Sequence, residues 1–357
     1  MPESDLPPVF DGHNDTLLQL LFGKFDDPVS AFLEGREGGH MDLPRMHAGG
    51  LAGGLFAVFV PPSGRKTRRK GPKREGLDYD MPLPEAIEQA AALPDALSMI
   101  ALLVRIERAS AGRFRICRSV ADIRAAMDAG AIAAVLHFEG AEAIDPEFRA
   151  LDVFYAAGLR SLGLVWSRPT LYAHGVPFRF PAGPDTGEGL TEKGRELVRA
   201  CNARGIAVDL SHINERGFWD VAEISDAPLI ASHSNAHVLC PHPRNLTDEQ
   251  LAAVRDSGGI AGLNFGACFL RSDGKMNADT PVSTMVDHID HMIGVMGEAH
   301  VGLGSDFDGA SIPREIGDCA GLPALQRAMR ERGHSEETIR LVSGENWLRV
   351  LERTWGG

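Results

Sequence analysis

The feature that most constrains this chain is a series of eight short apolar runs that alternate with stretches long enough to form helices. Each run is rich in Val, Ile, Leu or Ala and is bounded by Gly, Pro, Asn or Ser, which is typical of buried parallel strands. The runs cover residues 8–15, 53–61, 131–140, 158–167, 205–213, 227–234, 258–266 and 300–309. Eight strands that alternate with helices predict an α/β fold of the (β/α)8 TIM-barrel type.

Several segments between the runs carry apolar residues at helical spacing. We expect helices over residues 84–103, 119–130, 191–204, 247–257 and 285–297. The fourth of these opens with a capping-box pattern, Thr-x-x-Gln. Two helical patterns between residues 323 and 355 are expected to pack outside the barrel. An open, doubly wound sheet is the alternative, but the first run lacks the GxGxxG turn that such a fold uses to bind phosphate.

The whole chain, residues 1–357, is expected to form a single barrel domain with loop insertions, because no linker, repeat or low-complexity tract divides it. With 44% hydrophobic residues, the chain has enough apolar material for one large core. The segment Ser-Gly-Arg-Lys-Thr-Arg-Arg-Lys that begins at residue 63 opens a strongly basic stretch ending at residue 80. A solvated loop is the preferred interpretation, and a clamp for an anionic ligand is the alternative.

Charge and composition exclude several classes of protein. The chain has 36 Lys and Arg against 49 Asp and Glu, which gives a net charge of −13 and argues against a binder of nucleic acid or anionic membranes. No window resembles an apolar membrane span, and the N-terminus lacks the pattern of a secretory signal. Five scattered cysteines without a CxxC pair indicate neither a zinc ribbon nor a disulfide framework. A cytoplasmic enzyme is expected.

Histidine and carboxylate side chains close five of the eight runs. They are His13 and Asp15 in the first run, Glu139 in the third, His212 in the fifth, His233 in the sixth and Asp306 in the eighth. The carboxyl ends of the strands in such a barrel meet at one mouth, and these ligand types suit Zn²⁺. If Glu139 bridges, two ions would each have three protein ligands and would share a hydroxide. Asp306 would then be placed to pass a proton to a leaving group.

These residues lie within motifs that resemble the renal (membrane) dipeptidase family of zinc peptidases, a group of amidohydrolase-type metal barrels. The matching stretches span nearly the whole chain in family order. They are DGHNDTL at 11–17, MDLPRMHAGGLAGGLFAVFV at 41–60, HFEGAEAI at 137–144, VDLSHI at 208–213, IASHSNAH at 230–237, PRNLTDEQL at 243–251, HVGLGSDFDG at 300–309 and GENWLRVL at 344–351.

The resemblance implies a set of roles for the matching positions. The implied ligands of two zinc ions are His13, Asp15, Glu139, His212 and His233, with Glu139 shared between the ions. Asp306 matches the family's proton shuttle, and Asp308, on the same strand face but further out, is the weaker candidate. His137 shares strand parity with Glu139, so an accessory role at the mouth is possible for it.

Two further positions concern the substrate. Arg244 matches the family's Arg that holds the substrate carboxylate, and pairing of Arg244 with Asp248 is the structural alternative. Human-like members have a His after the fourth strand that stabilises the reacting carbonyl oxygen, but here the position is Trp166. Trp donates only through its indole N–H. Either metal polarisation carries more of the reaction, or His174 or Arg168 supplies a donor in the substrate loop.

The sequence therefore predicts a zinc-dependent dipeptidase in which a metal-bridging hydroxide attacks the peptide bond of a small dipeptide. The resemblance implies that a D-residue at the second position (L-X-D-Y) is accepted, and that the chain forms a homodimer. The first alternative is hydrolysis of another small amide, an N-acyl amino acid or a lactone on the same centre. A barrel that binds metal without turnover is the second, although such a protein needs neither Asp306 nor Arg244. A phosphate-binding isomerase or aldolase is disfavoured because the expected Gly-rich turn and catalytic Lys are missing.

Overall fold

The eight predicted runs form a closed ring of parallel strands in the computed structural model, which describes residues 6–62 and 79–356. The order around the ring is β2-β1-β11-β10-β9-β8-β6-β5, and pairing of β2 with β5 closes it. These strands are β1 (Val9–Asn14), β2 (Leu51–Phe59), β5 (Ile132–Glu139), β6 (Leu159–Gly163), β8 (Ala207–Asp209), β9 (Ile230–Ala231), β10 (Ile260–Leu263) and β11 (Val301–Leu303). The prediction of a (β/α)8 barrel is confirmed.

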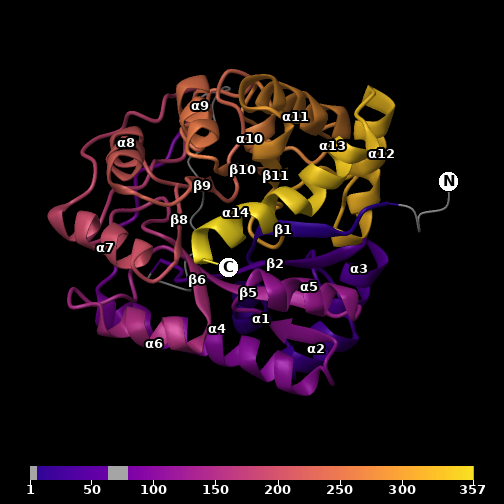
Figure 1. The fold of residues 1–357 in the computed structure, drawn as a ribbon, viewed down its shortest axis with the longest axis horizontal. Helices are drawn as coiled ribbons and strands as arrows, with labels where there is room; N and C mark the ends of the chain where they lie inside the picture. The colour runs from indigo at the N-terminus through magenta and orange to yellow at the C-terminus, as the bar shows by residue number, and fades with distance from the viewer. Residues whose placement is uncertain (1–5, 63–78, 357) are drawn as a thin grey trace.

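Helices surround this ring (Figure 1). They are α1 (Thr16–Phe22), α2 (Pro28–Glu34), α3 (Leu43–Ala48), α4 (Gln89–Ala109), α5 (Val120–Asp128), α6 (Arg149–Ala157), α7 (Glu192–Asn202), α8 (Glu215–Ile224), α9 (Asp248–Asp256), α10 (Ala267–Leu270), α11 (Val282–Met296), α12 (Leu322–Arg332), α13 (Glu336–Arg340) and α14 (Asn346–Trp355). All five helices expected between the runs are present. The capping box of α9 is confirmed, because Thr247 and Gln250 bond reciprocally to each other's backbone N–H.

The C-terminal helices lie outside the barrel, as predicted, and α14 also closes its amino end. Figure 1 shows α14 running across the middle of the ring of strands. Trp347 is fully buried, and its indole N–H donates to the backbone oxygen of Leu303 at 2.9 Å. A Cβ at Gly12 would lie 2.3 Å from the Trp347 ring, and one at Gly302 would lie 2.6 Å from it. Glycine at these two strand positions therefore makes room for the indole.

One expectation about composition was wrong. No apolar window long enough to span a bilayer was expected, but the helix α4 is long and apolar enough by length and composition alone. Seven of its residues are buried, including Met99, Leu103 and Ile106, and they belong to the hydrophobic core around the barrel. Packing of this face against the rest of the core accounts for the apolar composition of α4.

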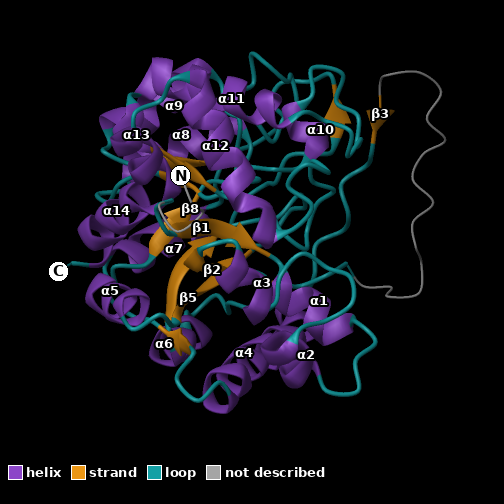
Figure 2. Cartoon of the chain, turned by 90° about the vertical axis from the view of Figure 1, so that its right-hand side faces the viewer, coloured by secondary structure: helices purple, strands orange, loops and turns teal. Residues whose placement is uncertain are grey.

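Short strands that the sequence analysis did not predict occur in two places. The strand β4 (Phe114–Ile116) pairs in parallel with the start of β5. The strand β3 (Tyr79–Asp80) pairs in antiparallel fashion with β7 (Arg179–Phe180), and so joins the loop after β2 to the loop after β6. Figure 2 shows the long loops gathered on the side of the molecule opposite to α14. Most of the predicted basic loop, residues 63–78, lies outside the described residues.

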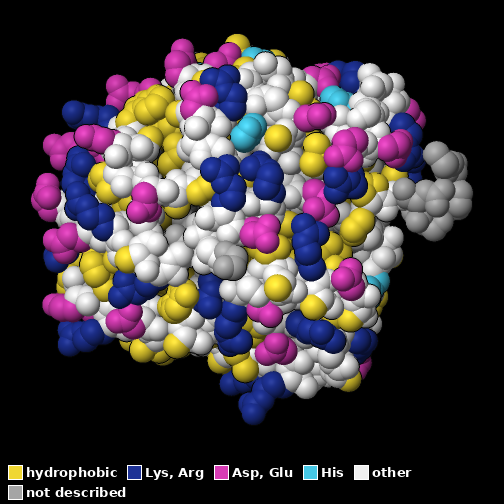
Figure 3. All heavy atoms as spheres, in the orientation of Figure 1, with side chains coloured by type: hydrophobic (Ala, Val, Ile, Leu, Met, Phe, Trp, Pro, Cys, Tyr) yellow, Lys and Arg dark blue, Asp and Glu magenta, His cyan; other side chains and the backbone are white. Residues whose placement is uncertain are grey.

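The molecular face in Figure 3 carries mixed charge. Lys and Arg side chains are interspersed with Asp and Glu side chains rather than grouped by sign. Surface ion pairs of the described chain, such as Arg332 with Asp290, follow the same pattern. Since positive and negative side chains are neighbours across this face, their fields partly cancel, and the net negative charge of the protein is not concentrated there.

Candidate metal centre and active site

Five predicted ligand side chains meet at the carboxyl end of the barrel. Two groups of three carry ligand atoms within 4.8 Å of one another, namely His13, Asp15 and Glu139 in one group and Glu139, His212 and His233 in the other. All five residues are buried. Glu139 is the last residue of β5 and is common to both groups. The sequence prediction that Glu139 stands between two sets of ligands therefore agrees with the geometry.

A single carboxylate oxygen joins the two groups. Glu139 Oε1 lies 2.9 Å from Nε2 of His212 and 3.6 Å from Nε2 of His233. The same oxygen lies 3.8 Å from Nε2 of His13, which in turn is 3.7 Å from Oδ2 of Asp15. These atoms come from strand ends spread around the barrel, so closure of the ring brings them together.

The carboxylates of this cluster are electrostatically unfavourable in the absence of a cation. Burial raises the pKa of Glu139 well above its usual range, and the negative charges of Asp15 and Asp306 raise it further. Burial also raises the pKa of Asp15 to about 7, with a contribution from the charge of Asp308. Buried carboxylates that repel one another are stable only if they are protonated or if a positive charge joins them.

The histidines of the cluster are neutral, and one of them, His13, lacks a hydrogen-bond partner among the described residues. Burial lowers the pKa of His212 and of His233 well below the usual range of histidine. Both ring nitrogens of His13 are buried without a hydrogen-bond partner among the described residues, and so is Oδ1 of Asp15. Neutral imidazoles and unpartnered carboxylate oxygens at this spacing are the donor set that divalent metal ions bind. The residues present therefore fit a metal centre.

Serine hydroxyls orient two of the histidine rings. Ser167 Oγ lies 2.8 Å from Nδ1 of His212, and Ser232 Oγ lies 2.7 Å from Nδ1 of His233. The Ser232 hydroxyl donates to Asp209 Oδ2 at 2.5 Å, so it accepts its second bond from Nδ1–H of His233. This tautomer leaves the lone pair of Nε2 in His233 directed at Glu139 and His212.

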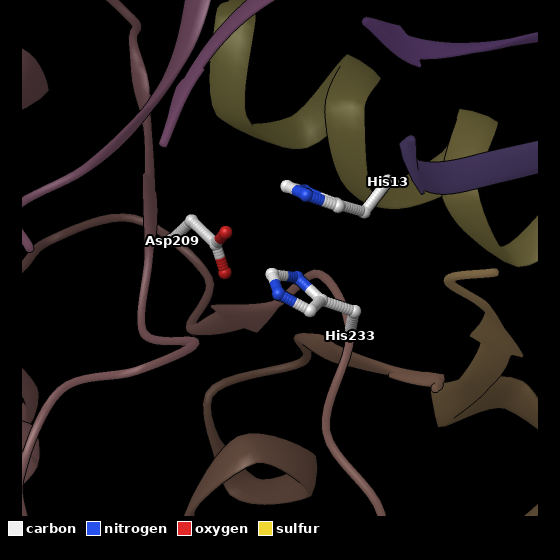
Figure 4. A group of neighbouring side chains, drawn as sticks. All are labelled: His13, Asp209 and His233. Carbon is white, nitrogen blue, oxygen red and sulfur yellow. The ribbon is translucent and has the colours of Figure 1, made fainter. Parts of the chain in front are cut away.

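Sequence reasoning missed Asp209, although it lies in the quoted motif VDLSHI at the end of β8. Figure 4 shows its carboxylate beside the rings of His233 and His13, which are stacked on each other. Its ligand-type atoms form a third close group with those two histidines. Because Asp209 already accepts bonds from the Ser211 N–H and from both the N–H and the O–H of Ser232, we assign it to orienting the ligands. Its strand-end position was the signal that could have found it.

His137 lies deeper in the barrel than the sequence analysis suggested. Its ring is fully buried, with Nδ1 2.9 Å from Ser161 Oγ and Nε2 3.6 Å from Oδ2 of Asp209. It belongs to the polar layer beneath the cluster, next to the ring of His13. In the structure it is therefore a neighbour of Asp209 rather than a group at the mouth.

Asp306 and Asp308 differ in the hydrogen-bond and ion-pair partners of their carboxylates. Oδ2 of Asp306 accepts a bond from Asn264 at 2.9 Å, and burial together with the charge of Asp15 raises its pKa to about 6. The carboxylates of Asp306 and Asp15 are neighbours, and both lie next to Gly309. A Cβ at Gly309 would lie 2.4 Å from Asp306 Oδ1 and 2.0 Å from Asp15 Oδ2. Asp306 therefore lies beside the metal-ligand cluster, with Asn264 bonded to one of its oxygens and Asp15 next to the other.

Asp308, by contrast, is engaged by several donors. Its carboxylate accepts from Thr16 Oγ1 at 3.0 Å and from the backbone N–H of His40 at 2.6 Å. It also forms a buried ion pair with Arg36. These contacts join the segment before α3 to the loop after β11, so Asp308 has a structural task that Asp306 lacks.

Arg244 is a buried cation without a carboxylate partner among the described residues. Its Nη2 donates to the backbone oxygen of His233 at 2.9 Å, and its guanidinium carbon lies 5.5 Å from the centre of the Phe269 ring. Its Nε has no hydrogen-bond partner in the described part of the chain. Pairing with Asp248, the structural alternative, is wrong, because Asp248 instead lies 2.7 Å from His291. A buried guanidinium with unused donor capacity is suited to binding an anion.

A cavity of ≈ 260 Å³ opens beside the cluster. Its polar lining includes Asp15, Glu139, His212 and Asp306, and its apolar lining includes Leu18, Phe59, Tyr79, Met81, Trp166, Phe178, Phe269 and Met276. Trp166 therefore faces the cavity. His174 and Arg168, the two predicted substitutes for the missing His, are not among its lining residues. Arg168 is fully buried and is paired with Glu142 at 2.6 Å.

A parallel barrel whose mouth holds two overlapping groups of buried histidines and carboxylates defines a class of metal-dependent barrel enzymes. Comparison with known proteins identifies the family within this class. The family model described as membrane dipeptidase (peptidase family M19) matches residues 5–355. The chain belongs to this family, and it is a metallo-dipeptidase that hydrolyses peptide bonds.

Three similar proteins illustrate the match. A metallo peptidase from Rhodobacter sphaeroides, solved with a phosphinate mimic of the dipeptide L-Ala-D-Ala, is 52% identical with a TM-score of 0.95, covering 98% of this chain and 100% of that chain. A solved structure described as dipeptidase AC is 51% identical with a TM-score of 0.92, covering 99% and 100%. Dipeptidase tcpJ of Claviceps purpurea is 30% identical over 96% of this chain and 76% of its own length.

Proposed function

We propose that this protein is a zinc-dependent dipeptidase that holds two Zn²⁺ ions and hydrolyses dipeptides of the L-X-D-Y type. The observation that carries the proposal is the shared position of Glu139 between two groups of ligand atoms. His13 and Asp15 would complete one ion's protein ligands, and His212 and His233 the other's. The R. sphaeroides relative binds a mimic of L-Ala-D-Ala, which supports a dipeptide with a D-residue at its second position. Two bound cations would supply a nucleophilic water at neutral pH and would polarise the peptide carbonyl.

The chain's own residues account for the remaining tasks. Arg244 would bind the C-terminal carboxylate, since its guanidinium is buried, unpaired with any described carboxylate and stacked on the cavity residue Phe269. Asp306 Oδ1 would take a proton from the attacking water and transfer it to the departing amine. Its carboxylate lies beside the ligand Asp15, where a carboxyl group can both accept and release a proton. Asn264 would hold the other oxygen of Asp306 in place.

The second candidate is hydrolysis of an N-acyl amino acid, another small amide or a lactone on the same centre. The observation that favours it is Trp166, which stands where human-like family members have a His and which lines the cavity with apolar surface. An N-acyl amino acid would retain the carboxylate that suits Arg244, whereas a lactone would not. Cytoplasmic localisation and a homodimeric assembly stay predictions from the sequence.

A kinetic panel combined with metal analysis tests the proposal. The enzyme would be purified, stripped with a chelator, dialysed, and reloaded with Zn²⁺, Mn²⁺ or Co²⁺ while bound metal is counted by mass spectrometry. We expect activity to return as occupancy approaches two ions per chain, and kcat/KM to be higher for L-Ala-D-Ala than for L-Ala-L-Ala, N-acetyl-D-Ala or a lactone. Full activity of the metal-free protein, or a clear preference for the lactone, would contradict the proposal.

A further inference from the structure

We propose that a wall of three aromatic rings, Phe59, Trp166 and Phe178, makes this enzyme selective for dipeptides whose amino-terminal residue has a large apolar side chain. This inference rests on the proposed function and adds a substrate class to it. The wall is referred to below as the aromatic wall, and it is formed from the end of β2 and the loops after β6.

The three rings pack in sequence along one side of the cavity. The centres of Phe59 and Trp166 are 5.1 Å apart, and those of Trp166 and Phe178 are 5.6 Å apart. All three residues line the cavity beside the metal ligands, and Trp166 is also 5.9 Å from the ring of His212. A substrate bound at the ligands would therefore place one of its side chains against this apolar surface. Burial of an apolar side chain there is favourable, whereas burial of a charged side chain is not.

A buried ion pair fixes the wall from behind. The guanidinium carbon of Arg168 lies 5.4 Å from the ring centre of Phe59 and 5.5 Å from that of Trp166. Arg168 Nε donates to Glu142 Oε1 at 2.6 Å, and a second donor reaches the backbone oxygen of Val60. Both charged side chains are fully buried. Breaking a buried pair of this kind leaves an uncompensated charge, so the geometry indicates that Arg168 and Glu142 are positioning residues for the wall.

The location of Arg244 indicates which substrate residue meets the wall. Its guanidinium stacks on Phe269, which is 6.2 Å from Phe178 and so lies beyond the end of the wall. Phe59 is at the opposite end of this row of rings, separated from Phe269 by Trp166 and Phe178. If Arg244 holds the C-terminal carboxylate, the C-terminal residue lies near Phe269. The amino-terminal side chain then extends toward Phe59 and Trp166.

A dipeptide series that varies one position at a time tests this inference. The wild-type enzyme and Trp166→Ala would be assayed on X-D-Ala with X as L-Phe, L-Leu, L-Ala, L-Glu or L-Lys, and on L-Ala-D-X with the same side chains. We expect wild-type kcat/KM to favour L-Phe and L-Leu over L-Glu and L-Lys at the first position by about tenfold to a hundredfold. We expect Trp166→Ala to remove most of this preference, measured as the ratio of kcat/KM for L-Phe-D-Ala to that for L-Ala-D-Ala.

Two further variants separate positioning from general damage. Trp219→Ala is the matched control, because Trp219 is a partly exposed Trp on α8 that does not line the cavity, and we expect no change in the preference. Arg168→Met should lower kcat/KM for L-Phe-D-Ala more than for L-Ala-D-Ala, mainly through KM, and Arg168→Lys should restore part of the ratio. If Arg168 had a purely structural role, Arg168→Met would lower kcat/KM equally for both substrates.

The outcomes distinguish this inference from the proposed function. Hydrolysis of L-Ala-D-Ala without a preference at the first position, or with a preference at the second position only, would overturn the inference and leave the dipeptidase proposal intact. Equal losses on both substrates in Arg168→Met would overturn the assignment of Arg168. If metal-loaded wild-type enzyme hydrolysed none of the dipeptides, the proposed function would fail, and the inference with it.

Discussion

The two ends of the barrel are filled in opposite ways by the same strands. On one face of β5, Ala133 and Val135 belong to an apolar cluster that also contains Trp347. The next residues of that face toward the carboxyl end, His137 and Glu139, are buried and polar. Apolar packing at the amino end stabilises the fold, whereas the buried charges at the carboxyl end cost stability unless a cation binds them. In this barrel, therefore, the residues that stabilise the fold lie at the amino ends of the strands, and the residues that carry the chemistry lie at their carboxyl ends.

The largest expected effect comes from removing the shared carboxylate at the carboxyl end. Glu139→Gln should lower kcat/KM by about 10³-fold or more, because both groups of ligands lose the negative charge that they share. The metal-free variant should be at least as stable as metal-free wild type, since a buried charge that repels Asp15 is gone. Metal content, steady-state kinetics and thermal unfolding measured after chelation check this. A metal-free variant markedly less stable than metal-free wild type would show that this end stabilises the fold after all.

The second prediction compares two carboxylates at the same end. Asp306→Asn should lower kcat by about 10²- to 10⁴-fold with bound metal retained, because the proton carrier is lost. Asp308→Asn is the matched variant, and it should mainly lower the free energy of unfolding, by about 3 kcal/mol, because it breaks the buried pair with Arg36. Kinetics, metal counts and urea unfolding of both variants separate the two roles. Equal losses of kcat in the two folded variants would contradict the assignment.

At the amino end, Trp347→Ala should lower the free energy of unfolding by about 3–5 kcal/mol, because it leaves a large cavity in a closely packed region. The backbone oxygen of Leu303 would also lose its indole partner. The folded fraction should keep its metal content and its kcat/KM, since this end takes no part in the chemistry. Chemical unfolding curves and activity per folded molecule provide the measurement. A comparable loss in kcat/KM at full folding would show that the two ends are coupled.

The smallest expected effect concerns a histidine that fastens loops at the carboxyl end. The ring of His288 bonds through Nε2 to the backbone oxygen of Leu270 at 2.9 Å and through Nδ1 to the backbone N–H of Ala236 at 3.3 Å. Burial lowers the pKa of His288 to about 4. Because the unfolded chain binds this proton near pH 6.5 and the folded chain does so only near pH 4, stability falls as the pH drops between these values.

This histidine should account for about 2 kcal/mol of the loss in the free energy of unfolding between pH 7 and pH 5. His288→Gln should flatten the dependence of stability on pH by that amount. Met292→Leu on the same helix removes no titratable group, so it is the control and should leave the slope unchanged. Urea unfolding across this pH range provides the measurement. An unchanged slope in His288→Gln would contradict the prediction.

The sequence predicted the barrel and the metal ligands for a local reason. Each strand is a short apolar run with its own turn residues, and each ligand closes one of those runs, so both signals can be read without knowing which strands are neighbours. The short strands β3 and β7 were not predicted, because two-residue strands exist only through the pairing of distant loops. The apolar window in α4 was also missed, although its composition is a property of the sequence alone.

The sequence alone determined which residue types stand at the strand ends. These residue types were sufficient to indicate the class of chemistry. Only the tertiary structure decided what each polar group contacts. The pair of Arg36 and Asp308 joins residues 272 positions apart, and the bond from Asn264 to Asp306 joins residues 42 positions apart. Such contacts depend on closure of the ring and on side-chain directions in space, which no local pattern encodes. For the same reason, no local pattern encodes the aromatic wall and its buried ion pair, because they bring together the end of β2 and the loops after β5 and β6.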